Sequence, residues 1–139
     1  MVQLIVGEKG KGKTKHLLDK VNTEVKTVSG NVVYLDKSAK HMYELNNKVR
    51  LIDVSDYLID NYSEFIGFVS GIVSQDHDLE KMYFDSFLII SKSDISQLDE
   101  IIEKLDKLSA KFGVDFIISV SANVANLSES TKSKVLLAL

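Results

Sequence analysis

The chain has no cysteine, no proline and no tryptophan among its 139 residues, and Arg50 is its only arginine. Without cysteine there can be no disulfide, no cysteine-ligated metal and no thiol nucleophile. The three histidines, at positions 16, 41 and 77, do not have the spacing of metal ligands. Disulfide-stapled domains, cysteine-based metal sites and thiol enzymes are therefore excluded.

Long apolar runs are also absent. The longest apolar stretch, residues 65–73, is about half of the roughly 20 residues that a membrane-spanning helix needs. The sequence starts with a strand-like segment and has neither the charged start nor the cleavage site of a signal peptide. We therefore expect no membrane insertion, residence in the cytoplasm, and a single globular domain over residues 1–139.

The charge is small but uneven. The formal net charge is −3; residues 1–50 hold ten Lys or Arg against five Asp or Glu, and the remaining residues hold seven against fifteen. Most lysines of the first half lie around one glycine-rich segment, and no alternation of basic and aromatic residues follows. A nucleic-acid surface is therefore disfavoured, because charged runs are usually solvated faces.

Two patterns of apolar residues alternate along the chain, continuous short runs and helical spacing. Short continuous runs at residues 2–6, 32–35, 82–84 and 115–120 are typical of buried strands. Helical spacing marks residues 17–25 and residues 95–108; the second helix begins at Ser93 or Asp94 and closes near Gly113. Strands that alternate with helices predict an α/β domain of three layers with a mainly parallel central sheet.

Three further segments are predicted from weaker patterns. Residues 41–45 and 48–53 flank Asn46-Asn47 and indicate a hairpin or two short strands. Ser55 or Asp56 is expected to cap a helix that runs to residue 73. Residues 128–139 begin polar and end apolar, and form either a last helix or a closing strand.

The segment Gly-Glu-Lys-Gly-Lys-Gly-Lys-Thr at residues 7–14 matches the pattern G-x-x-x-x-G-K-[ST] in full. It lies directly after a predicted strand and directly before a predicted helix, which is the structural context that the motif requires. Glycines let backbone N–H groups curl around an anion, and the helix start adds its partial positive charge. The predicted nucleotide-binding residues are Gly7, Glu8, Lys9, Gly10, Lys11, Gly12, Lys13, Thr14 and Lys15.

This loop resembles that of the P-loop NTPase superfamily, and the order of elements is most similar to a minimal RecA-like ATPase core. The specific match covers the eight-residue loop; the rest of the chain matches by element order alone. The resemblance implies the P-loop NTPase fold, ATP or ADP as ligand and Mg²⁺ as cofactor. Lys13 would then reach the β and γ phosphates as a catalytic residue, and the Thr14 hydroxyl would ligate Mg²⁺.

A P-loop enzyme also needs a carboxylate near the metal ion, at the end of a neighbouring core strand. Asp85, which follows an apolar run, is our first choice for this Walker B residue, and Asp53 is the rival. Many ATPases of the superfamily have a glutamate directly after the Walker B aspartate. Ser86 stands there in this chain, so we expect slow hydrolysis.

RecA-like ATPases carry their catalytic carboxylate at the end of the strand after the P-loop helix, where this chain has Asp36. An equally weighted interpretation is that Asp36 only ends a strand and begins a turn. Ser119 and Ser121, near the end of the strand at residues 115–120, resemble the polar sensor that contacts the γ phosphate. Polar residues are common at strand ends, so the sensor assignment depends on the resemblance.

Two other activities are disfavoured. Residues 91–94 resemble the guanine-reading N-K-x-D without its Asn, residues 121–123 resemble the S-A-K loop only in part, and no D-x-x-G occurs. A small-molecule kinase would need several arginines over the phosphates, and this chain has one. We therefore expect a weak ATPase whose missing arginine comes from a protein partner or a second copy. The alternative is a nucleotide-responsive binding module without significant turnover.

Overall fold

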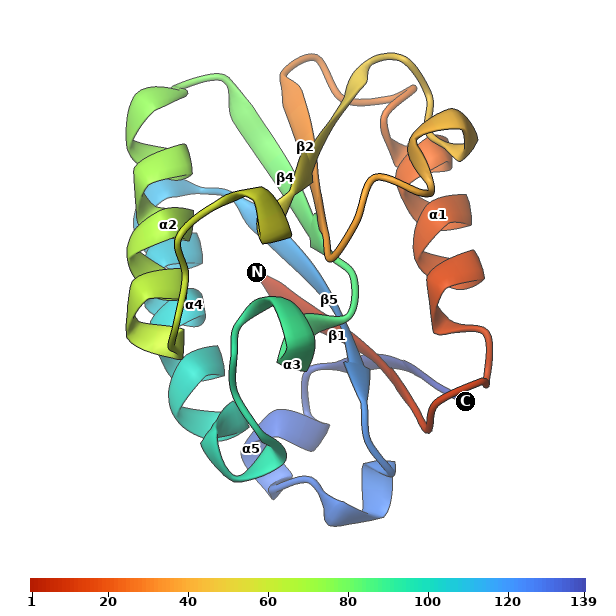
Figure 1. Cartoon of the computed structure of the whole chain (residues 1–139), viewed down its shortest axis with the longest axis vertical. Helices are drawn as coiled ribbons and strands as arrows, with labels where there is room; N and C mark the ends of the chain where they lie inside the picture. Colours follow the sequence, from red (N-terminus) through yellow and green to blue (C-terminus); the bar gives the residue numbers. More distant parts are fainter.

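A parallel sheet of six strands runs through the centre of the computed structural model, which describes all residues from 1 to 139 (Figure 1). Every strand pair is parallel, and the order across the sheet is β3-β2-β4-β5-β1-β6. The strands are β1 (Val2–Gly7), β2 (Asn31–Asp36), β3 (Val49–Asp53), β4 (Leu79–Phe84), β5 (Asp115–Ser121) and β6 (Val135–Ala138). The predicted α/β architecture is confirmed, and the sheet is wholly parallel.

Helices cover both faces of this sheet and complete three layers (Figure 1). α1 lies on one face, and α2 and α4 lie on the other. The α-helices are α1 (Lys13–Glu24), α2 (Tyr62–Gln75), α3 (Phe87–Ile90), α4 (Leu98–Phe112) and α5 (Glu129–Lys132), and the 3₁₀ turns are η1 (Met42–Glu44), η2 (Val54–Asp56), η3 (Ile95–Gln97) and η4 (Val124–Asn126). None of these helices combines the length and the apolar character needed to cross a lipid bilayer.

The alternation of side chains along each strand produces two separate apolar cores. On the α1 face, Ile5, Tyr34, Tyr83 and Ile117 pack with the buried residues of α1. On the α2 and α4 face, a larger cluster contains four phenylalanines, in which the ring of Phe84 makes edge-on contacts with Phe65, Phe87 and Phe116. Burial of both faces explains why the strands are continuous apolar runs rather than alternating ones.

The prediction of a hairpin or two short strands at residues 41–45 and 48–53 is correct only for the second segment, which forms β3. Residues 42–44 form the 3₁₀ turn η1 instead of a strand, and β3 pairs with β2 in parallel, with Val49 opposite Val32 and Asp53 opposite Asp36. Asn46 has a different role: its amide donates to the side chain of Asn22 on α1, at 2.8 Å. The Asn46-Asn47 turn therefore belongs to a crossover between parallel strands, which a local turn pattern cannot distinguish from a hairpin.

The helix expected to begin at Ser55 or Asp56 begins later, so that prediction is wrong. Residues 54–56 form η2, and the Asn61 side chain caps α2 by accepting a hydrogen bond from the Glu64 amide at 2.9 Å. The Glu64 carboxylate in turn accepts from the Asp60 amide at 2.6 Å. The apolar spacing located the helix, but these hydrogen bonds fix where it starts.

The last third of the chain follows the prediction more closely. Asp94 caps η3, which continues into α4, and α4 ends at Gly113 in the left-handed region with φ 67°. Glycine adopts that conformation without steric cost. The tail contains both predicted alternatives, since the short helix α5 is followed by the edge strand β6.

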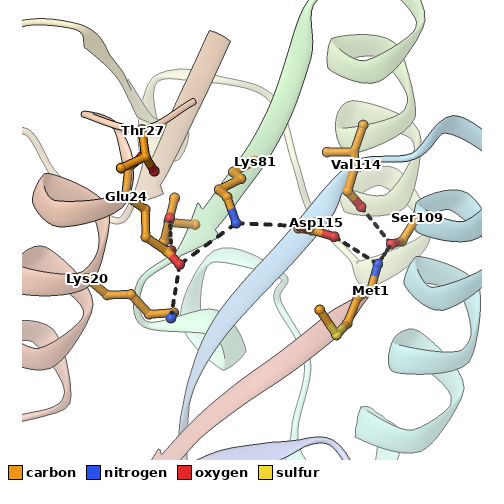
Figure 2. Close-up of polar contacts among 9 residues, drawn as sticks. Met1, Lys20, Glu24, Thr27, Lys81, Ser109, Val114 and Asp115 are labelled. Atoms are coloured by element: carbon orange, nitrogen blue, oxygen red, sulfur yellow. Dashed lines mark hydrogen bonds and ion pairs between the residues drawn. The ribbon is translucent and has the colours of Figure 1, made fainter. Parts of the chain in front are cut away.

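A polar network ties the end of α1 to the sheet (Figure 2). Glu24 receives hydrogen bonds from Lys20 at 3.2 Å and from the Tyr83 hydroxyl, and it lies 3.8 Å from the Lys81 ammonium. Lys81 also pairs with Asp115 of β5 at 3.4 Å. α1 is therefore anchored at its C-terminal end to β4 and β5, at the opposite end from the glycine-rich loop.

Candidate functional site

The glycine-rich loop connects β1 to α1 at the edge of the sheet where the parallel strands end. Gly10 and Gly12 have φ values of 86° and 90°, a left-handed conformation that side chains other than glycine rarely adopt. No side chain caps the start of α1. The first N–H groups of a helix lack partners within it, so this end of α1 is left open to an anion.

Lys13, the first residue of α1, is buried although it carries a charge. Its side chain is 8% exposed, and it lies in no ion pair. Its Nζ donates to the Glu8 carbonyl oxygen at 3.1 Å. Burial lowers the pKa of Lys13 below its ordinary value, and the nearby Asp85 opposes that shift. A buried ammonium that lies in no ion pair favours an anionic ligand at this place.

Asp85 directly follows β4 and is 2% exposed. Both of its carboxylate oxygens accept hydrogen bonds from hydroxyl groups. Thr14 Oγ1 donates to Oδ1 at 3.1 Å, and the Tyr34 hydroxyl donates to Oδ2 at 2.7 Å. The threonine of the loop and the carboxylate of β4 are thus already in contact.

The rival carboxylate, Asp53, lies elsewhere. It ends the edge strand β3, where its Oδ1 accepts from the amide of Ser55 at 3.0 Å and from the hydroxyl of Ser55 at 2.6 Å. This carboxylate caps η2 and does not line the cavity beside the loop. Its local partners explain its position without a metal.

A cavity of about 400 Å³ opens between the loop and the ends of β4 and β5. From the predicted set, Ser119 of β5 lies buried in its wall, and Ser121 lies exposed two residues further along. The residues around it are Lys9, Gly10, Gly12, Lys13, Thr14, Lys37, Asp85, Ser86, Phe87, Leu88, Ile89, Ser119 and Ser121.

Four residues of the predicted binding set do not line this cavity: Gly7, Glu8, Lys11 and Lys15. The Gly7 carbonyl accepts a hydrogen bond from the Ala122 amide at 3.1 Å. The Glu8 carboxylate accepts from the Asn123 side chain at 3.5 Å. These bonds hold the loop against the segment that follows β5.

Asp36 ends β2, beside β4, and is 2% exposed. Its Oδ1 accepts from the Lys37 amide at 2.7 Å, whereas its Oδ2 has no partner. Burial raises the pKa of Asp36, and the charge of Asp85 raises it further, against smaller opposing effects from Lys37 and His41. Asp36 does not line the cavity, but it retains a free acceptor next to the Asp85 strand.

Sequence reasoning missed Tyr34 and Lys37, and it noted Ser86 only as the residue that stands in place of a glutamate. Tyr34 could have been identified, because a residue two positions before Asp36 on a strand lies on the same face. Ser86 has a φ of 53°, a left-handed conformation that is uncommon outside glycine. It turns the chain from β4 into α3, so that Phe87, Leu88 and Ile89 line the cavity. No sequence pattern marked that turn.

The residues present fit a magnesium ion that is shared with a phosphate ligand. No group of three or more His, Cys, Asp or Glu residues could hold a metal by itself. Mg²⁺ usually binds through one or two protein ligands, with water and phosphate oxygens completing its shell. The Thr14 hydroxyl and the Asp85 carboxylate are the two candidate ligands.

Comparison with known proteins shows a similarity of fold. No protein-family model matches the chain, and no curated protein matches its sequence. Among solved structures, a KaiC-like protein from the hyperthermophilic archaeon Pyrococcus horikoshii OT3 superposes with a TM-score of 0.66. The match covers 95% of this chain and 67% of that chain, at 16% sequence identity. At this identity the likeness establishes the three-layer α/β fold alone.

Proposed function

We propose that the chain binds a magnesium nucleotide, ATP or ADP, and is a weak ATPase of RecA-like architecture. The observation that carries the proposal is Lys13, a buried ammonium without an ion-pair partner at the wall of a cavity of about 400 Å³. A full P-loop motif surrounds this lysine. The likeness of the fold to a KaiC-like protein supports the RecA-like part of the proposal.

Each group would act on a different part of the nucleotide. Backbone N–H groups of the loop and the start of α1 bind phosphate oxygens, and Lys13 neutralises the β and γ phosphates. Thr14 and Asp85 would hold Mg²⁺, which would offset charge on the phosphoryl group. Ser119 and Ser121 are candidates to contact the γ phosphate from β5.

Asp36 is the candidate for orienting the attacking water and accepting its proton. Its unpartnered Oδ2 and raised pKa fit a proton acceptor better than a metal ligand. An aspartate reaches less far than the glutamate usual in RecA-like enzymes, and burial keeps this one outside the cavity wall. Slow turnover follows from this geometry.

A second candidate function is a nucleotide-responsive module without significant turnover. It is favoured by the absence of arginine from the cavity wall. Arg50, the only arginine, lies on β3 opposite Val33 and lines a separate cavity beside α2. For the ATPase, an arginine over the phosphates would have to come from a partner protein or a second copy.

Calorimetric titration of Mg-ATP into the protein tests the binding itself. Lys13→Ala should remove most of the affinity without unfolding the chain, because the lysine contributes to phosphate binding rather than to the apolar core. Lys26→Ala is the matched control, since Lys26 is exposed, lies in no ion pair and follows α1. Unchanged ATP affinity in folded Lys13→Ala would reject the P-loop assignment.

A turnover assay separates the two candidate functions. The nucleotide that copurifies with the protein is first identified by mass spectrometry, and its hydrolysis is then measured with and without Mg²⁺ and protein partners. Slow Mg-dependent release of phosphate supports the ATPase. Tight binding without any release, even with partners present, favours the nucleotide-responsive module.

A further inference from the structure

Two buried tyrosines lie side by side between the sheet and α1. Tyr34 of β2 and Tyr83 of β4 are register partners, both are 0% exposed, and their rings stack at 6.5 Å between centroids. Their hydroxyl groups have different partners. Tyr34 donates to Asp85 at the candidate site, and Tyr83 donates to Glu24 at the far end of α1. Figure 2 shows Glu24 with its partners Lys20 and Lys81.

We propose that Tyr34 is a positioning residue that fixes the Asp85 carboxylate for Mg²⁺ binding; this inference rests on the proposed nucleotide function. Asp85 has only two side-chain hydrogen-bond donors, Thr14 on Oδ1 and Tyr34 on Oδ2. Thr14 is itself a candidate metal ligand. Tyr34 is therefore the donor to Asp85 that does not also bind the ion.

The surroundings make the Tyr34 hydroxyl a rigid support. Its ring is enclosed by the core on the α1 face and stacked on Tyr83, so the hydroxyl cannot turn to another acceptor without moving the core. The backbone of Asp85 is also bonded to β2, because the Asp85 amide donates to the Leu35 carbonyl oxygen at 2.9 Å. β2 thus supports the Asp85 backbone through Leu35 and its side chain through Tyr34.

Removal of this one hydroxyl should loosen Asp85 specifically. In Tyr34→Phe, the buried Oδ2 would lose its donor and the carboxylate could rotate away from the metal position. A hydrogen bond to a charged group contributes about 1.5–3 kcal/mol, which converts to a factor of roughly ten to a hundred in affinity. The loss should appear in the interaction with Mg²⁺ and not in contacts between the loop and the phosphates.

The experiment is a Mg²⁺ titration of ATP binding to the full chain. Tyr34→Phe should raise the Mg²⁺ concentration for half-maximal stimulation of ATP binding by about tenfold or more. The affinity for ATP measured in excess EDTA should stay within about twofold of wild type. Tyr83→Phe is the matched control, because it removes a buried hydroxyl from the stacked partner ring and should leave the Mg²⁺ midpoint unchanged.

A double-mutant cycle tests whether Tyr34 acts through Asp85. In an Asp85→Asn background, Tyr34→Phe should produce no further shift of the Mg²⁺ midpoint. A wild-type midpoint in Tyr34→Phe, or an equal shift with and without Asp85, would overturn the assignment. If Tyr34→Phe does not fold, the Tyr34 hydroxyl proton of the wild type is followed by NMR; no shift when Mg²⁺ joins bound ATP would overturn it too.

Failure of the proposed function gives a different result. Wild-type protein would then bind no ATP at any Mg²⁺ concentration, and the titration would be flat before any variant is compared. A normal wild-type titration that Tyr34→Phe leaves unchanged rejects the positioning role alone.

Discussion

Asp36 ends β2, and Asp85 directly follows the neighbouring strand β4. The surroundings of the two carboxylates nevertheless differ. Two hydroxyl donors hold Asp85, whereas one oxygen of Asp36 has no partner and burial raises the pKa of that residue. Two carboxylates whose surroundings differ in this way often have different chemical roles. We therefore expect Asp85 to hold the metal ion and Asp36 to act on water.

The comparison of Asp85→Asn with Asp36→Asn tests this division. Asp85→Asn should weaken Mg-dependent nucleotide binding, because an amide does not offset the charge of the ion, and hydrolysis should fall with it. Asp36→Asn should leave binding nearly unchanged and lower turnover by about 10²- to 10⁴-fold, the usual range for a general base. Calorimetry and phosphate release measure the two effects.

The outcomes for Asp36 are distinct. If Asp36→Asn hydrolyses ATP at the wild-type rate, its catalytic role is lost and Asp36 becomes a residue that only ends a strand. If the wild type shows no turnover, the comparison of binding still tests Asp85. Asp53→Asn is the control for a carboxylate at the end of another strand, and it should change neither quantity.

At the scale of the elements, the segment between α3 and α4 bears on whether the site would prefer adenine or guanine nucleotides. The Asp94 carboxylate accepts from the Ser96 amide at 2.9 Å, and the Gln97 side chain accepts from the Asp94 amide at 3.1 Å. Ser91 is fully buried and hydrogen-bonded to Ser93. These side chains form the start of η3 and α4, so residues 91–94 have a structural explanation that does not involve guanine.

ATP should therefore bind at least as tightly as GTP. The guanine-reading pattern lacks its Asn, and its Asp already caps a helix. A competition titration of the two nucleotides measures the ratio of their affinities. A strong preference for GTP would contradict this expectation and make residues 91–94 a base-recognition segment.

The starts of helices were predicted less well than the helices themselves. The apolar residues of α2 showed its periodicity, but Ser55, Asp56 and Asn61 are all good capping residues, and only Asn61 accepts a hydrogen bond from the first turn of α2. Leu58 follows the helical spacing of the sequence but is 97% exposed in the structure. Capping depends on where neighbouring strands place the chain, which one segment alone does not reveal.

For the whole molecule, the sequence predicted the layers and the loop but not the order of the strands. β5 lies between β1 and β4, so Ser119 and Ser121 stand between the loop and Asp85. Pairing between distant segments determines this order, and no local pattern encodes it. The same reason explains why β3, a parallel edge strand, resembled half of a hairpin.

Bound nucleotide should stabilise the whole domain, because the loop, α1 and the ends of β4 and β5 all line the cavity and would contact the same ligand. A ligand at 100 times its Kd adds about 2.7 kcal/mol to the free energy of unfolding. Mg-ATP should therefore raise the Tm of the wild type in a thermal scan, and EDTA should reduce the gain. Lys13→Ala should show no gain, and a rise equal to that of wild type would indicate binding elsewhere.

The position of β1 in the sheet has a consequence for biosynthesis. β1 precedes the other five strands in the chain, but its two neighbours in the sheet are β5, at Asp115–Ser121, and β6, at Val135–Ala138. β2, β3 and β4 can pair with one another much earlier on the ribosome. Contacts so distant in sequence form slowly. The glycine-rich loop follows β1, so the strand that carries it is not flanked by its sheet neighbours until β5 and β6 have both been synthesised.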